Sequence, residues 1–163
     1  MNVKAVLTTC PYCGCGCRFF LLVADGKLVG VQPCKSDEIS QGRLCIKGYN
    51  AHAFVQHPDR LKHPMVRRGG DLKPVSWDEA LGKLVMELKR IRDKHGPDSI
   101  AILASAKCTN EENYLFQKLA RAVIGTNNVD HCARLCHAST VTGLLYSFGS
   151  GAMTNTIPEF DDA

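Results

Sequence analysis

Two apolar runs in the first third of the chain predict a β-hairpin. Residues 19–23 and 28–31 are apolar, and the dipeptide Asp25-Gly26 lies between them. This dipeptide accepts the positive φ angles of a tight hairpin turn. We therefore predict two antiparallel strands within residues 18–32.

The pattern is weaker in the residues that follow. A short helix is expected over residues 48–55, because the proline of His57-Pro58 disfavours helical backbone at the residue before it. Residues 57–75 are expected to be extended, since prolines interrupt them and Gly69-Gly70-Asp71 marks a turn. Residues 1–56 are thus predicted to form a small β-rich domain with little core of its own.

An amphipathic helix is predicted to begin after Ser76. Ser76 and Glu79 have the spacing of a capping box, in which each side chain binds a free backbone amide of the first turn. Gly96-Pro97 ends the helical pattern. The predicted inward face consists of Ala80, Leu81, Leu84, Val85, Leu88 and Ile91. The side chains expected to face solvent are Lys83, Glu87 and Arg90.

A strand and a second helix are predicted next. Residues 100–104 are a continuous apolar run, which is typical of a buried parallel strand. The helix that follows has Thr109 and Glu112 as its capping box and Gly125 at its end. Its predicted inward face consists of Leu115, Leu119, Ala122 and Val123.

The remaining elements complete an α/β pattern. A short strand or loop is expected at Val129, and a third helix over residues 139–146. Helices and strands that alternate over short links predict an open α/β layer. This layer has one long strand, so we interpret residues 57–163 as the first, truncated part of an α/β domain. The predicted fold class is α/β, with the small β-rich domain followed by this incomplete open α/β domain.

Composition limits the function classes. The chain has 163 residues, of which 45% are hydrophobic and 22% charged, as in soluble globular proteins. No apolar run is long enough to cross a bilayer, and the first residues lack the features of a signal peptide, so we expect a cytoplasmic protein without a membrane segment. The net charge of +4 is mild, and we expect no nucleic-acid partner. Nine cysteines without a secretory signal argue for metal ligation rather than disulfides.

The cysteine spacing identifies the candidate metal site. A Cys-x-x-Cys-x-x-x-Cys motif is followed by a fourth cysteine further along the chain, and a 4Fe–4S cluster takes four thiolates in such an arrangement. Gly14 and Gly16 are expected to let the backbone curl around the cluster. The alternatives are a structural zinc site, which usually takes cysteines as two separated close pairs, and unligated thiols. The four candidate ligands are Cys10, Cys13, Cys17 and Cys45.

Four segments of the chain carry a family resemblance. They are Cys10-Pro11-Tyr12-Cys13-Gly14-Cys15-Gly16-Cys17, Arg43-Leu44-Cys45-Ile46-Lys47-Gly48, Pro74-Val75-Ser76-Trp77-Asp78-Glu79-Ala80 and Ala133-Arg134-Leu135-Cys136-His137. Together they resemble the amino-terminal part of the molybdopterin (bis-MGD) oxidoreductases. Within that family, the chain looks most like the catalytic subunit of formate dehydrogenases, because a histidine directly follows the residue that matches the metal ligand. Such subunits are several times longer, so the resemblance is to their first portion.

The resemblance implies a role for each matching residue. The four candidate cysteines match the 4Fe–4S ligands, and Lys47 matches the lysine between cluster and pterin. Cys136 matches the protein ligand to molybdenum or tungsten, and His137 matches the adjacent histidine of the formate enzymes. The implied catalytic residues are thus Cys136, His137 and Lys47.

The resemblance also implies cofactors and partners. The cofactors are a 4Fe–4S cluster and molybdenum- or tungsten-bis-molybdopterin guanine dinucleotide. The reaction is anaerobic oxidation of formate to carbon dioxide, or its reverse. The partners are the remaining part of the catalytic subunit and an electron-transfer subunit that carries flavin or further iron–sulfur clusters.

Simpler interpretations remain open at this point. Cys136 is alternatively a small buried apolar residue, His137 a hydrogen-bonded core histidine, and Lys47 an ordinary solvated lysine. The whole chain is alternatively part of a nitrate reductase or formylmethanofuran dehydrogenase, or a non-catalytic 4Fe–4S electron-transfer module. The cysteines predicted only to pack are Cys15, Cys34, Cys108 and Cys132.

Overall fold

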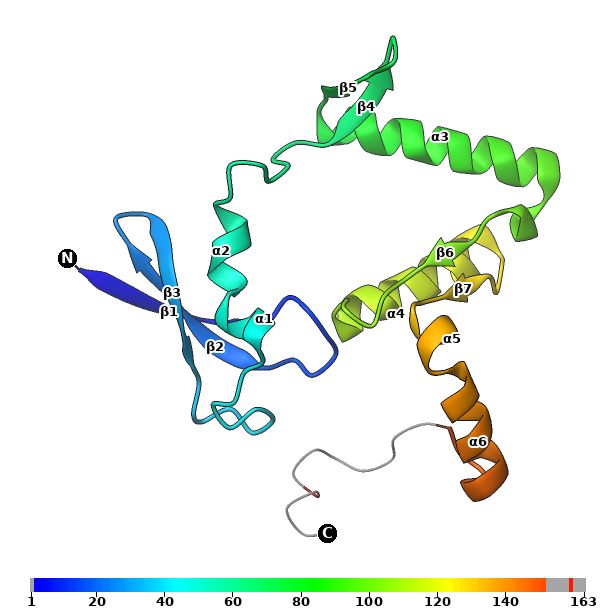
Figure 1. The fold of residues 1–163 in the computed structure, drawn as a ribbon. Helices are drawn as coiled ribbons and strands as arrows, with labels where there is room; N and C mark the ends of the chain where they lie inside the picture. Colours follow the sequence, from blue (N-terminus) through cyan, green and yellow to red (C-terminus); the bar gives the residue numbers. More distant parts are fainter. Residues whose placement is uncertain (1, 152–158, 160–163) are drawn as a thin grey trace. The chain divides into compact units, whose positions relative to one another are not determined.

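The structure is a computed structural model that describes residues 2–151 and residue 159 (Figure 1). Its backbone contacts divide the chain into two compact units. The first unit contains the described residues of Met1–Gln56, Leu103–Leu115 and Asp130–Ala163. The second contains His57–Ile102 and Phe116–Val129. Each unit is described by itself below.

A three-stranded antiparallel sheet begins the first unit (Figure 1). Its strands are β1 (Val3–Thr9), β2 (Arg18–Ala24) and β3 (Lys27–Pro33), in that order across the sheet. The predicted hairpin of β2 and β3 is confirmed, and both turn residues have positive φ angles, 50° at Asp25 and 76° at Gly26. The sequence analysis missed β1, because the segment joining it to β2 has no tight-turn signal.

Two short helices follow this sheet, where a single helix was predicted over residues 48–55. They are α1 (Ile46–Tyr49) and α2 (Ala51–Val55), separated at Asn50. The Asn50 side-chain amide donates to the Ile46 carbonyl oxygen at 2.8 Å. An asparagine side chain that competes for backbone groups in this way ends a helix.

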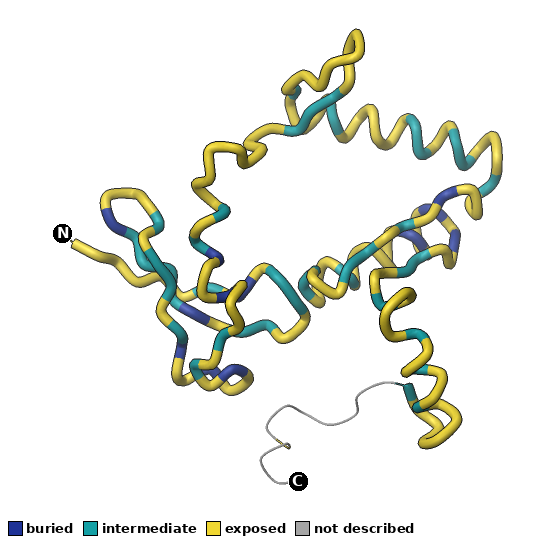
Figure 2. Tube along the Cα trace, viewed as in Figure 1, coloured by how far each residue is buried: buried dark blue, intermediate teal, exposed yellow. Residues whose placement is uncertain are grey.

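The core of this part of the unit is small (Figure 2). Phe19 is 1% exposed and packs with buried Cys10 and Ala51. Cys10, one of the candidate ligands, is therefore itself a core residue. Packing of this part of the chain and the candidate metal site thus depend on the same side chain. The partly buried residues around this cluster are Tyr12, Cys17, Leu21, Val31 and Leu44.

The second unit begins with a hairpin and a long helix. Strands β4 (Met65–Arg68) and β5 (Asp71–Pro74) pair antiparallel, and helix α3 (Trp77–His95) follows. The predicted extended segment and helix are confirmed. The Ser76 hydroxyl accepts the Glu79 amide at 3.2 Å, whereas the Glu79 carboxylate binds the Arg68 guanidinium of β4.

The apolar face of α3 is largely open, contrary to the prediction (Figure 2). Leu81 is 50% exposed and Leu84 is 52% exposed. The later turns of α3 line a cavity of about 110 Å³ within the unit. The apolar residues lining that cavity are Val85, Leu88, Ile100, Leu119, Val123 and Ile124.

The predicted strand over residues 100–104 is shortened to β6 (Ile102–Leu103), which pairs with β7 (Val129–Asp130). The Ile102 amide donates to the Asn128 carbonyl at 2.8 Å, and the Ala104 amide donates to the Asp130 carbonyl at 2.7 Å. Both partners advance in the same direction, so the pairing is parallel, as predicted. Burial of the strand was predicted wrongly for Leu103, which is 84% exposed, because the described residues place no layer over it.

Helix α4 (Asn110–Lys118) has a complete capping box. The Thr109 hydroxyl accepts the Glu112 amide at 3.2 Å, and the Glu112 carboxylate accepts the Thr109 amide at 2.8 Å. The π-helical segment η2 (Leu119–Ile124) continues it and ends at Gly125. The wider π turn changes which side chains share a face. In this segment burial falls on Ala120 and Ile124, and not on the predicted inward residues Leu119, Ala122 and Val123; the predicted inward residue Leu115, which lies in α4 before the π turn, is also exposed.

The capping box of α4 allows a direct test of this local structure. We expect Thr109→Ala to cost about 1 kcal/mol locally, and so to speed exchange of the first-turn amides about fivefold. Hydrogen-exchange mass spectrometry of the peptide covering α4 measures this. Thr140→Ala, an exposed threonine outside the box, is the control. Equal exchange in the two variants would contradict the assignment.

Two helices end the described part of the chain. They are α5 (Ala133–Cys136), which was not predicted, and α6 (Ala138–Phe148), which confirms the predicted third helix. His137 joins them with φ −128° and ψ −10°, outside both helices. Among the described residues, no helix has the length and apolar character needed to span a membrane.

Candidate metal centre

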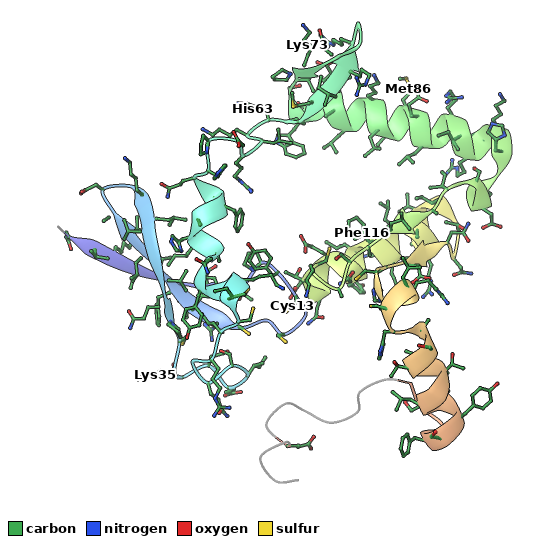
Figure 3. The ribbon with its side chains drawn as sticks, viewed as in Figure 1. Cys13, Lys35, His63, Lys73, Met86 and Phe116 are labelled. Carbon is green, nitrogen blue, oxygen red and sulfur yellow. The ribbon has the colours of Figure 1, made fainter. Side chains whose placement is uncertain are left out.

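The strand pairing builds the loop that carries three of the candidate ligands. Thr9 and Arg18 are paired at the ends of β1 and β2, and the Cys10 amide donates to the Cys17 carbonyl at 2.8 Å. We call residues 10–17 the cysteine loop. Figure 3 shows Cys13 on this loop, between the two strands. The first and third cysteines of the motif are thus held together at the base of the loop by main-chain bonds.

The two glycines of the cysteine loop have different roles. Gly16 has φ 65°, a left-handed conformation that strains other residues, as expected for a chain that curls back. Gly14 has no positive φ and is constrained instead by a close neighbour. A Cβ atom there would lie 2.6 Å from Asn110 Oδ1, and Asn110 Nδ2 donates to the Gly14 carbonyl at 2.8 Å. The positive φ of Gly16 fits the predicted curl of the chain, and at Gly14 the absence of a Cβ atom makes room for Asn110.

Cys45, the fourth candidate ligand, is exposed at the start of α1. The backbone amides of Gly48 and then Lys47 lower the pKa of the Cys45 thiol; burial opposes them, and the Lys47 charge adds a smaller effect. Both amides belong to the first turn of α1, and their hydrogen bonding favours the charged form of the sulfur. The helix start therefore favours the thiolate, the form that ligates metals.

The cysteine loop and Cys45 lie within electrostatic reach of one another. Burial raises the pKa of Cys10, and the charges of Cys13 and Cys45 raise it further, against the Tyr12 amide. Burial also raises the pKa of Cys17, with Cys10 and Cys13 among the neighbours that add to it. The thiols of the cysteine loop, Cys15 included, and the thiol of Cys45 therefore act on one another electrostatically.

The donor set fits an iron–sulfur cluster. All four donors are thiols, the ligands that such clusters take, and one tight loop supplies three of them. Among the described residues, no group of three or more His, Cys, Asp or Glu side chains is arranged to hold a single metal ion. The roles of the individual cysteines remain a proposal, which is made below.

A buried carboxylate, which the sequence analysis missed, lies beside the cysteine loop. Burial disfavours ionisation of Asp37, but the Ser40 hydroxyl and amide and the Arg18 amide outweigh it and hold the Asp37 pKa below its usual value. Such a carboxylate stabilises the fold above its unfolded pKa, and the contribution is lost as the pH falls through the lowered folded value. Its signal in the sequence is the Asp-x-x-Ser spacing of a side-chain turn.

The second candidate site lies at the junction of α5 and α6. Cys136 ends α5 and His137 follows it, and both side chains are exposed. The structure thus does not bury either side chain, which the simpler interpretations required. The described contacts do not join this pair to the four cysteines of the first site, and Lys47 is likewise exposed on α1.

Neighbouring contacts fix where α5 begins. The Ala106 amide donates to Cys132 Sγ at 3.4 Å, and the Arg134 guanidinium binds the Asp130 carboxylate one turn earlier. Together these contacts attach the short helix to the segments that follow β6 and β7. A cavity of about 260 Å³ lies beside the junction, lined by Asp130, His131, Ala133, Arg134, Ala138, Val141 and Thr142.

The other cysteines differ in burial. Cys34 is buried and Cys108 is half-buried, in line with the prediction that they pack. Cys15 and Cys132 are exposed, so that prediction was wrong for them. The Cys15 thiol interacts with the Cys13 thiol of the same loop, and the Cys132 sulfur accepts the Ala106 amide instead of packing against apolar groups.

Comparison with known families identifies the chain. Residues 3–57 match the Fe4S4 domain of molybdopterin oxidoreductases, and residues 60–163 match the molybdopterin oxidoreductase family itself. The chain belongs to the molybdopterin oxidoreductase family. The α/β fold class, with a 4Fe–4S domain ahead of the oxidoreductase domain, is thereby confirmed. The family also carries the two predicted cofactors, a 4Fe–4S cluster and a molybdopterin cofactor.

Several family members are similar to this chain along nearly all of its length. It is 51% identical over 163 residues to F420-dependent formate dehydrogenase 1 subunit alpha of Methanococcus maripaludis, covering 24% of that protein. It is 49% identical to formate dehydrogenase H of Escherichia coli, with 98% of this chain and 23% of that protein covered. The chain therefore spans about a quarter of the length of the curated relatives it matches.

Proposed function

We propose that this chain is the amino-terminal portion of a formate dehydrogenase catalytic subunit. Its reaction is oxidation of formate to carbon dioxide, or the reverse, at a molybdenum or tungsten centre held by bis-molybdopterin guanine dinucleotide. The relatives named above support this proposal through the formate dehydrogenase activity in their names. The observation that carries it is the exposed Cys136-His137 pair at the junction of α5 and α6, where both side chains are accessible to a bound group.

The first site holds the 4Fe–4S cluster in this proposal, through Cys10, Cys13, Cys17 and Cys45. Main-chain bonds at the base of the cysteine loop set the first and third ligands, and the start of α1 supplies the fourth as a favoured thiolate. We assign the 4Fe–4S domain to residues 1–56 and the first part of the oxidoreductase domain to residues 57–163.

The second site carries the chemistry on formate. When bound, the metal–pterin group accepts the two electrons of formate oxidation. Cys136 supplies the soft thiolate ligand that anchors this group to the protein. His137, placed next to the ligand and outside both helices, supplies an imidazole that can accept the proton that the reaction releases.

In this proposal Lys47 assists electron transfer between the two sites. It follows the Cys45 ligand by two positions on α1, and its charge already acts on the Cys45 thiol. A positive charge there stabilises the reduced cluster, and its ammonium group is suited to donate hydrogen bonds to the pterin. The cluster then passes electrons to a subunit carrying flavin or further iron–sulfur clusters, in an anaerobic, cytoplasmic enzyme.

The proposed activity is tested on the enzyme that contains this chain. We expect anaerobic preparations to contain iron together with molybdenum or tungsten, and to reduce a viologen dye with formate. Nitrate and formylmethanofuran, each with its matched redox dye, are the competing substrates. Iron without molybdenum or tungsten would support an electron-transfer module instead, and turnover of a competing substrate in place of formate would contradict the proposal.

Replacement of Lys47 tests its role in electron transfer. We expect Lys47→Ala to leave both metal contents unchanged and to slow reduction of the cluster by formate about 10- to 100-fold, as for other groups that support a redox centre. Rapid-freeze spectroscopy of the cluster after mixing with formate measures that rate. Lys27→Ala removes an exposed lysine from β3 and is the control. Cluster reduction at the wild-type rate in Lys47→Ala would remove Lys47 from the relay.

A further inference from the structure

One buried carboxylate oxygen collects three hydrogen bonds next to the cysteine loop. Asp37 is 5% exposed, and its Oδ2 accepts the Ser40 hydroxyl at 2.5 Å, the Ser40 amide at 2.9 Å and the Arg18 amide at 3.3 Å. Ser40 is buried as well. A buried carboxylate with this many donors is strongly held, because hydrogen bonds to a charged group are stronger than those between neutral groups.

These bonds join the two parts of the chain that carry the third and fourth candidate ligands. Arg18, whose amide Asp37 accepts, is the residue directly after Cys17, and Ser40 lies on the segment that leads to Cys45. Main-chain bonds reinforce the junction, since the Cys34 amide donates to the Arg18 carbonyl at 3.2 Å. The carboxylate therefore holds the end of the cysteine loop and the segment before α1 together through hydrogen bonds.

The negative charge of Asp37 is not neutralised by an ion pair at this junction, in the part of the chain that the structure describes. Its three hydrogen-bond donors in the described structure are two backbone amides and one hydroxyl, all of them neutral, and the Arg18 charge is the smallest of the effects that lower its pKa. No ion pair to the carboxylate is found among the described residues. A fixed negative charge next to a redox centre disfavours the reduced form, because reduction adds a further negative charge.

We propose that Asp37 is a positioning residue for the iron–sulfur cluster, which holds the Cys45 segment against the Cys17 end of the loop and lowers the reduction potential of the cluster. This inference rests on the proposed ligand set. Asp37 does not ligate iron and does not touch substrate. It acts through the Arg18 and Ser40 backbone on the spacing of two ligands, and through its charge on the potential.

Two substitutions at Asp37 separate the two effects. Asp37→Ala removes the contacts and the charge, whereas Asp37→Asn removes the charge and keeps an oxygen that can accept the same donors. Glu38→Gln is the matched control, because it removes the same charge from an exposed side chain one residue along. The full chain of each variant is reconstituted anaerobically with iron and sulfide. Iron content, the rate of cluster loss to a chelator and the midpoint potential from an EPR-monitored redox titration are measured.

We expect Asp37→Ala to lose its cluster about tenfold faster than wild type, in proportion to a lost hydrogen bond to a buried charge. Asp37→Asn should keep wild-type iron content and show a more positive midpoint potential, while Glu38→Gln leaves both unchanged. Should Asp37→Ala not fold, Asp37→Asn and its potential still decide the question.

Two results would overturn the inference. One is a wild-type rate of cluster loss in Asp37→Ala. The other is a potential in Asp37→Asn that matches Glu38→Gln, which would leave Asp37 a structural loop residue. A wild-type chain that binds no cluster would instead contradict the ligand set itself, so the two failures are distinguishable.

Discussion

Replacing Cys45 by serine is expected to remove the iron–sulfur cluster from this chain. Cys45 is the one candidate ligand outside the cysteine loop, so no neighbouring thiol on α1 can take its place. A serine hydroxyl is a much weaker iron ligand than a thiolate, because iron–sulfur clusters are held by soft sulfur donors. We expect the visible absorption of the cluster to disappear and bound iron to fall to background after anaerobic reconstitution.

The same substitution should loosen the domain around the site. The described core of this part consists of few side chains, and Cys10 is one of them, so ligation and packing support each other. Where a metal site is formed only in the folded chain, its binding free energy contributes to folding. We expect faster hydrogen exchange in β2 and β3 of Cys45→Ser, and no such change in α3.

Cys15 provides the matched control for this experiment. It lies within the cysteine loop but is exposed and outside the proposed ligand set. Cys15→Ser should therefore retain iron at the wild-type level. Loss of the cluster in Cys15→Ser with retention in Cys45→Ser would contradict the assignment of the fourth ligand.

Replacing Cys136 by serine is expected to abolish formate oxidation in the enzyme that contains this chain. The proposed ligand sits at the end of α5 and is joined directly to His137, so a displaced metal also loses its proton acceptor. A misplacement of about 1 Å between reacting groups already costs on the order of a hundredfold in rate. We therefore expect at least about a hundredfold loss of turnover, while the 4Fe–4S signal is unchanged.

Cys132→Ser is the control for Cys136→Ser. Both residues are exposed cysteines near α5, but Cys132 is outside the proposed ligand set, and its contacts with the Ala106 amide and the His131 and Ser105 side chains are ones that a serine oxygen can also make. Turnover of Cys132→Ser should stay close to wild type. Wild-type turnover in Cys136→Ser would exclude Cys136 as the protein ligand of the metal.

Local features of the fold could be predicted because the residues that determine them are adjacent. The Asp25-Gly26 turn has both of its positive φ angles, and both capping boxes begin their helices where expected. The Thr109 box is complete, whereas the Glu79 carboxylate of the other box binds Arg68. Spacing in the sequence thus predicts where a helix begins better than it predicts which group each capping side chain binds.

Features that depend on distant residues could not be predicted in this way. The periodic apolar face of α3 is open in the described structure, because periodicity shows that a face is apolar and not what covers it. In η2 the π-helical turn places different side chains on the inward face than a regular α-helix would, and the buried residues are Ala120 and Ile124. The contact of Asn110 with Gly14 joins residues 96 positions apart, and nothing in the cysteine motif indicates it.

In the candidate site, too, local features could be predicted from the sequence and features that depend on distant residues could not. The cysteine spacing is local and was sufficient to identify the loop and to expect a fourth ligand from elsewhere. The Asp-x-x-Ser spacing indicates a turn at Asp37, but its burial and its bond to the residue after Cys17 needed the fold to be recognised, because acidic residues in polar segments are usually solvated.

The most direct test of this account is Mössbauer spectroscopy of the chain reconstituted with ⁵⁷Fe under anaerobic conditions, together with chemical analysis of iron, acid-labile sulfide and zinc. A cluster held by Cys10, Cys13, Cys17 and Cys45 predicts about four iron and four sulfide per chain and the spectrum of a 4Fe–4S cluster. A colourless protein that binds zinc in place of iron and folds equally well would contradict it.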